Sequence, residues 1–151
     1  LQEEEIMAIT FENIYKDRVI DNIQKLIKTS IPAIPLMYDE HRGQESILLT
    51  PVSDIFVEFN SNSQTRAYST LISFQIKRGS DFNKHTHLDR LTSIAEIIKR
   101  ILFDNRNYEA SNISQWYNGN VSSVDYERDS EEPEISRALI TFECSVNENT
   151  G

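Results

Sequence analysis

The strongest constraint on the fold is the regular alternation of residue types in two long segments. From Tyr68 to Lys77, and again from Arg137 to Val146, one set of alternate side chains is mainly apolar and the other is mainly polar. A period of two residues is typical of a β-strand that buries one face and keeps the other in water. The two segments therefore predict a sheet with one buried face.

Two amphipathic helices are predicted beside these strands. The first runs from about Thr10 to Lys28, with Thr10 as its N-cap, and prolines follow it. The second begins at the capping motif Thr86-His-Leu-Asp89 and ends near Asp104. Its core stripe recurs at helical spacing and comprises Leu88, Leu91, Ile94, Ala95, Ile98, Ile101 and Leu102.

Shorter strands complete the expected order of elements. Asp54–Phe59 is predicted as a strand with Ile55, Val57 and Phe59 on one face, after a polar arm from Asp39 to Thr50. A further hairpin is predicted, since asparagine and glycine tolerate positive φ. Its strands are Ile113–Tyr117 and Val121–Tyr126, and its turn is Asn118-Gly119-Asn120. Leu36–Tyr38 is a separate candidate for a short strand.

This order predicts an α+β fold in which a mostly antiparallel β-sheet is covered on one face by the two amphipathic helices. Residues 9–151 are expected to form a single domain, preceded by an N-terminal extension at residues 1–8. Met7 is a candidate for the native initiator, because the residues before it read as an added or upstream segment.

Composition limits the classes of partner. The chain has 151 residues and a net charge of −9, with 15 Lys and Arg against 24 Asp and Glu. A surface with this excess of negative charge repels phosphates, so specific nucleic-acid binding is not expected. No apolar run is long enough for a membrane span, and no secretion signal opens the chain.

Few residues suggest chemistry, and we predict no enzyme, cofactor or metal site. The four glycines are too far apart for a phosphate-binding loop. His85 and His87 would diverge at a helix start, and a metal would need further ligands such as Asp81, Asp89 or His41. Cys144 falls on the apolar face of the last strand, where a cysteine is expected to be buried and inert.

Some surface residues are candidates for protein contacts. Trp116 and Tyr117 are adjacent on a predicted strand, so at least one of them should lie away from the core, and both residue types are enriched at interfaces. Ordinary packing of each remains the alternative. The basic residues around the second helix are either a contact patch for an acidic partner or its solvated face: Lys77, Arg78, Lys84, Arg90, Lys99 and Arg100.

The layout resembles the tail terminator, or tail-completion, proteins of tailed phages, with the related minor tail and head–tail joining proteins. Four segments carry the resemblance, which covers nearly the whole chain from Ile9 and lies in their order, length and texture rather than in a signature motif. They are Phe11–Ile20, Thr70–Ile76, Leu88–Ile98 and Arg137–Glu143.

The resemblance implies a structural virion protein that forms a hexameric ring. Such a ring caps the head-proximal end of the tail tube, joins it to the neck or to portal-associated proteins, and is assembled in the host cytoplasm. DNA would slide through it without specific binding, because like charges repel. The residues then expected near the lumen or a docking face are Asp125, Glu127, Asp129, Glu131 and Glu132.

Two alternatives stay open at this stage. One is a different virion protein, such as a head–tail connector, a neck protein or a tail-tube subunit. The other is a small cellular enzyme or ligand-binding α+β domain, which would need a pocket with converging polar groups. For that second class the sequence offers only His85, His87 and the acidic loop at Asp129–Glu134.

Overall fold

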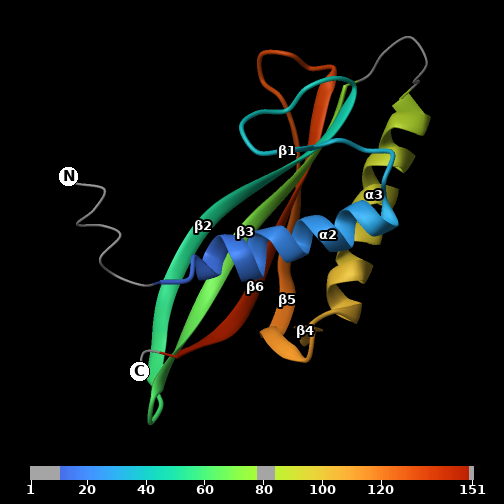
Figure 1. Cartoon of the computed structure of the whole chain (residues 1–151). Coiled ribbons are helices and arrows are strands. Elements are labelled where there is room, and N and C mark those ends of the chain that lie inside the picture. Colours follow the sequence, from blue (N-terminus) through green and yellow to red (C-terminus); the bar gives the residue numbers. More distant parts are fainter. Residues whose placement is uncertain (1–10, 78–83, 150–151) are drawn as a thin grey trace, which may run out of the picture.

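The computed structural model describes residues 11–77 and 84–149, so the extension at 1–8, Met7 and the Thr10 cap lie outside the described residues. One sheet and three helical segments make up this part of the chain (Figure 1). In chain order they are η1 (Tyr15–Ile20), α2 (Asp21–Ser30), β1 (Leu36–Met37), β2 (Glu45–Phe59), β3 (Ser63–Lys77), α3 (Lys84–Asp104), β4 (Tyr108–Ala110), β5 (Ile113–Arg128) and β6 (Ile135–Asn149).

The two alternating segments form strands, as predicted, and they are neighbours at the centre of the sheet. The strand order is β1-β2-β3-β6-β5-β4, in which β1 is parallel to β2 and every other neighbouring pair is antiparallel. The registers Ile72↔Ile140 and Phe74↔Ala138 join apolar side chains of β3 and β6 on the same face. All four side chains are buried, which confirms the predicted core face.

The helices supply the other side of the core. The first predicted helix is a π-helical turn, η1, that continues directly into α2, and Val19, Ile23 and Ile27 are its buried stripe. The second predicted helix is confirmed as α3, whose Ile94, Ile98 and Leu102 are buried against the sheet. No helix in residues 11–77 and 84–149 combines the length and apolar character needed to cross a membrane.

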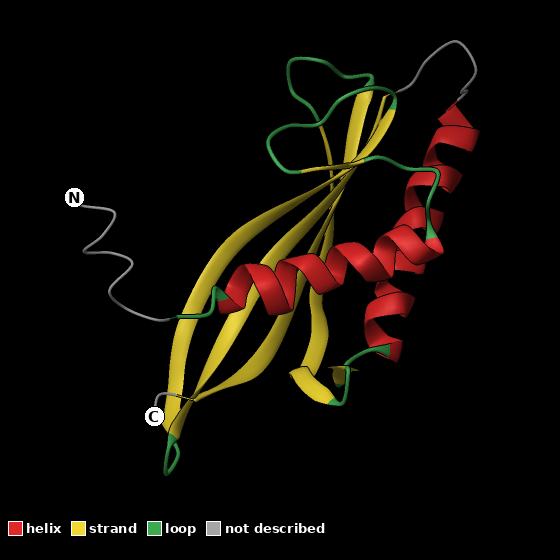
Figure 2. Cartoon of the chain, in the orientation of Figure 1, coloured by secondary structure: helices red, strands yellow, loops and turns green. Residues whose placement is uncertain are grey.

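The predicted arrangement of layers is wrong. About half of the described residues lie in strands, and the sheet is curled like half of a barrel instead of lying flat beneath two helices. Figure 2 shows α2 lying across the middle of the sheet and α3 running along one side of it, while the long strands continue well past α2. The broad α+β description still applies, but the helices are too short to cover one face of strands of 15 or 16 residues.

The predicted polar arm is wrong in its second half, because residues 39–44 form a loop but β2 begins at Glu45 and includes residues 45–50. Ser46 and Ile47 are both buried, so opposite faces of the strand are covered at this end. The polar face is covered by the preceding loop, whose His41 lies against Ser46 and Ser73. A strand that is buried on both faces loses the alternation by which it would be recognised.

The hairpin predicted around Asn118-Gly119-Asn120 does not form, because β5 is one continuous strand with register shifts near this tripeptide. Gly119 is needed there for close approach. A Cβ at this position would lie 2.9 Å from Cζ of Phe142 and 3.1 Å from the carbonyl oxygen of Arg106. The glycine thus lets the buried Phe142 ring of β6 pack directly against the backbone of β5.

Candidate functional site

The distal hairpin, defined as residues 52–66 of β2 and β3 with their connecting turn, is the most exposed apolar part of the described chain. It extends past η1 and α2 at the lower end of the sheet (Figure 1). Phe59 is 78% exposed, and four more large apolar residues of the same strand are exposed: Val52, Ile55, Phe56 and Val57. Exposed large apolar residues gathered in one segment in this way mark a protein contact more often than a solvated surface.

A β-bulge determines how these side chains are distributed. The register of β2 against β3 shifts between Phe56 and Glu58, and the rings of Phe56 and Phe59 lie 4.8 Å apart. The extra residue therefore brings Phe59 to the face of Phe56, while Ile55 points to the opposite face. The prediction that Ile55, Val57 and Phe59 share one face is wrong for this reason, and the hairpin presents apolar side chains on both faces.

The outer edge of the distal hairpin is open in the described chain. β1 pairs with β2 only at Ile47 and Leu48, and no described strand lies beside β2 farther along. Pro51 and the bulges interrupt this edge, which limits uncontrolled strand addition. Apolar faces combined with an interrupted edge indicate a specific contact through side chains.

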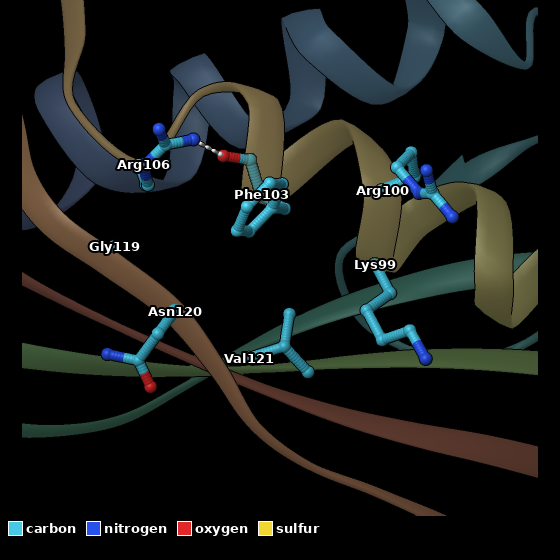
Figure 3. Close-up of a pocket in the computed structure, with 7 residues that line it drawn as sticks. All are labelled: Lys99, Arg100, Phe103, Arg106, Gly119, Asn120 and Val121. Atoms are coloured by element: carbon cyan, nitrogen blue, oxygen red, sulfur yellow. Dashed lines mark hydrogen bonds between the residues drawn. The ribbon is translucent and has the colours of Figure 1, made fainter.

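A second surface, the α3–β5 groove, is a cavity of about 470 Å³ between the end of α3 and the middle of β5. Figure 3 shows Phe103 in its centre, with Arg106 on one side and Lys99 and Arg100 on the other. The remaining lining residues belong to β5: Gly119, Asn120 and Val121. Phe103 is 58% exposed, so the groove offers an aromatic surface to a ligand or partner.

The groove is cationic although the chain as a whole is acidic. The guanidinium carbon of Arg106 lies 4.6 Å from the centroid of the Phe103 ring, and Lys99 forms an ion pair with Glu96 at 2.5 Å. Arg100 is exposed and forms no hydrogen bond or ion pair with any described residue. By contrast Arg90, from the same predicted basic cluster, is held by the Glu45 carboxylate at 2.8 and 2.9 Å.

Comparison with known proteins finds a similar structure but no similar sequence. No protein-family model and no curated protein matches the sequence. Among solved structures, the chain is similar to one described as "Virion of native gene transfer agent (GTA) particle", with a TM-score of 0.56 over 89% of this chain and 91% of that chain. The two chains share a fold. Their sequence identity is 12%, so the likeness concerns the fold alone.

The acidic candidates lie at the C-terminal end of β5 and in the β5–β6 loop. Arg137 holds two of them, with Nη1 3.2 Å from Glu127 and Nη2 3.0 Å from Asp129. Asp129 also accepts the backbone N–H groups of Glu131 and Glu132, each at 2.9 Å. These backbone bonds, followed by Arg137, lower the pKa of Asp129.

The same geometry leaves three of the five acidic candidates unneutralised. Asp125, Glu131 and Glu132 are exposed, and their carboxylates form no ion pair with a described residue. The loop is therefore a well-defined acidic turn, in which Asp129 fixes the backbone and its neighbours carry the outward charge. Its place near a lumen or docking face remains a prediction.

The two aromatic candidates have different environments. Trp116 is 1% exposed, stacks on Tyr108 at 5.0 Å between ring centroids, and donates its Nε1–H to the carbonyl of Asn105 at 2.8 Å. It belongs to the core of the fold and offers no exposed surface. Tyr117 points the other way, is partly exposed, and donates its hydroxyl to Asn147 at 3.1 Å.

The residues considered for catalysis are enclosed or incomplete. Cys144 is buried, as predicted, and burial raises the pKa of its thiol to about 12. The side chains of His85 and His87 lie outside the described residues. Within the described ranges, no group of three or more His, Cys, Asp or Glu residues is arranged to hold a metal ion.

Within the described part of the chain, His41 is the one histidine whose side chain is placed, and it lies between two serines. Its Nδ1 is 2.6 Å from Oγ of Ser46, and its Nε2 is 2.9 Å from Oγ of Ser73. Both serines are buried, so neither hydroxyl is open to a substrate as a nucleophile would have to be. The pairing instead fastens the loop before β2 to the outer face of the sheet.

This pairing predicts a dependence of stability on pH. Burial, and then the charge of Arg137, lower the pKa of His41 from 6.5 to about 4. Above pH 6.5 the ring is neutral in both the folded and the unfolded chain. As the pH falls from 6.5 to about 4, the unfolded chain takes up a proton first, so the folded state loses stability. After allowance for partial exposure, the loss is roughly 1–2 kcal/mol.

Urea unfolding at pH 7 and pH 4.5 tests this dependence against a variant, His41→Gln, whose amide can still bond both serines. The variant should lose less stability than the wild type between the two pH values, because it has no group titrating with His41. Equal losses in the two proteins would show that His41 does not contribute to acid sensitivity.

Proposed function

We propose that this chain is a structural protein of a virion that works by assembling with other proteins. The observation that carries the proposal is the fold shared with a chain of a gene transfer agent virion over nearly the full length of both chains. The exposed apolar side chains of the distal hairpin support it independently, because surface of this kind marks sites of protein contact.

Within this class, the proposed role is that of a tail terminator. The chain would form a ring, expected to be a hexamer, at the head-proximal end of a tail tube and would join the tube to the neck or connector. The net charge of −9 suits a ring through which DNA passes without adhering. The unpaired carboxylates of Asp125, Glu131 and Glu132 are the proposed lumen or docking residues.

The proposed role is not catalytic. It is supported by the burial of Cys144 and by the engagement of both ring nitrogens of His41 with buried hydroxyls. A small cellular binding domain would instead place polar side chains convergently in an enclosed pocket. The α3–β5 groove is open, with an exposed aromatic ring at its centre, which suits a macromolecular partner better.

Deletion of the gene in the host that produces the particle tests this role. We expect separate heads and tails, or tails of irregular length, and restoration of joined particles by the wild-type gene. An antibody against the protein should label the junction between head and tail in purified wild-type particles. Labelling at another position would favour a different virion protein, and absence of the protein from particles would contradict the proposal.

A further inference from the structure

We propose that the distal hairpin of one copy of this chain docks into the α3–β5 groove of a second copy, with Glu58 of the first facing Arg100 of the second. The inference rests on the proposed function only in taking the partner to be another copy of the same chain. It assigns the two sides of the contact between neighbouring subunits.

The distal hairpin supplies one side of the proposed contact between copies. Its apolar residues occupy both faces, so the strand can insert between two surfaces instead of lying on one. Its two carboxylates differ, because Asp54 is bound to Arg66 at 2.6 Å whereas Glu58 forms no ion pair with a described residue. Glu58 therefore retains an uncompensated charge on the same face as the exposed Ile55.

The α3–β5 groove supplies the other side of the proposed contact. Phe103 and Val121 form an apolar surface, and the cations around it have no carboxylate among the groove-lining residues. Arg106 and Lys99 are partly occupied by Phe103 and Glu96, which leaves Arg100 as the free guanidinium. An aromatic centre surrounded by positive charge is complementary to the exposed Ile55 side chain and the Glu58 carboxylate, which share one face of the distal hairpin.

The positions of the two surfaces favour a contact that repeats around a ring. In Figure 1 the distal hairpin and the end of α3 near β4 lie on different sides of the lower half of the molecule. A copy cannot fill its own groove with its own hairpin in this arrangement, so each copy presents one of each surface. Such a head-to-tail contact closes into a ring when its rotation is a whole fraction of a turn.

Charge exchange tests the pairing directly. Sedimentation velocity of the full chain up to its highest soluble concentration measures the association constant of the wild type, Glu58→Arg, Arg100→Glu and the double variant. We expect each single change to weaken association by at least about tenfold, and the double variant to recover most of it. Glu40→Arg and Lys25→Glu make the same charge changes on exposed residues outside both surfaces and should associate as the wild type does.

Each other outcome overturns the inference. If the wild type associates but the single variants do so equally well, copies meet through other surfaces while the proposed ring can still stand. If both single variants weaken association and the double variant is no better, Glu58 and Arg100 do not face each other. A chain that stays monomeric throughout contradicts a preformed contact between copies, and the particle labelling experiment then judges the virion role separately.

Discussion

Replacing Ile55 and Phe59 together by threonine is expected to reduce self-association at least about a hundredfold while leaving the subunit folded. Both side chains are more than half exposed in the isolated chain, so their loss should change the free energy of unfolding by less than about 1 kcal/mol. Burying such a side chain in an interface contributes about 1.5–3 kcal/mol, and two of them account for the expected loss of affinity. Threonine keeps a high strand propensity, so the hairpin itself should persist.

The matched control is Ile113→Thr, which removes an equally exposed apolar side chain from β5 outside the distal hairpin and outside the residues that line the groove. Its association constant should equal that of the wild type. Thermal unfolding monitored by circular dichroism confirms that all variants are folded. If the double variant associates normally, the apolar surface of the distal hairpin is not the contact.

Replacing Trp116 by alanine is expected to lower the free energy of unfolding by about 3–5 kcal/mol. The ring fills the core between Tyr108 and Phe142, at centroid distances of 5.0 and 5.5 Å. It also satisfies the carbonyl of Asn105 just after α3, so the variant leaves both a cavity and an unpaired acceptor. For a domain of this size the melting temperature should fall by on the order of 10 °C.

Two further variants separate these causes. Trp116→Phe keeps most of the packing but loses the indole N–H, and should be destabilised by about 1–3 kcal/mol. Tyr126→Ala removes an exposed ring from the same strand and should change stability by less than about 1 kcal/mol. If Trp116→Ala unfolds at the temperature of the wild type, the ring does not have the core role that its burial indicates.

The central strands and α3 could be predicted because their patterns report a single buried face. The apolar residues around Ile72 and around Ile140 recur with a period of two, and Ile94 and Ile98 recur with helical spacing. Each pattern therefore identifies its element from local sequence alone. The ends of the strands could not be predicted in the same way. How far the strands extend past the helices depends on pairing between β2, β3 and β6 in three dimensions.

The middle of β5 was misread because Gly119 has two physical uses. Next to asparagine a glycine is typical of a hairpin turn, yet here it admits the Phe142 ring, which comes from a distant segment of the chain. No local pattern distinguishes close approach from a turn. Trp116 was an interface candidate because of its residue type. Contacts with distant segments, which the local sequence does not show, make it a core residue.

The distal hairpin was missed as a candidate contact surface, although a signal was present. Ile55, Phe56 and Val57 are consecutive apolar residues, so both faces of this strand carry apolar side chains. The alternation predicts that Ile55, Val57 and Phe59 share one face of a strand, and alternating apolar residues usually face a core. Only the curl of the sheet and the short reach of α2 show that this end of β2 stays outside the core.

Electron cryomicroscopy of the particle that contains this protein tests most directly whether its copies assemble with one another through the distal hairpin. The proposed function and the further inference together predict a closed ring of copies in which the distal hairpin of each lies in the α3–β5 groove of the next, with Glu58 facing Arg100. Single copies without like neighbours, each with its distal hairpin surrounded by solvent, would contradict them.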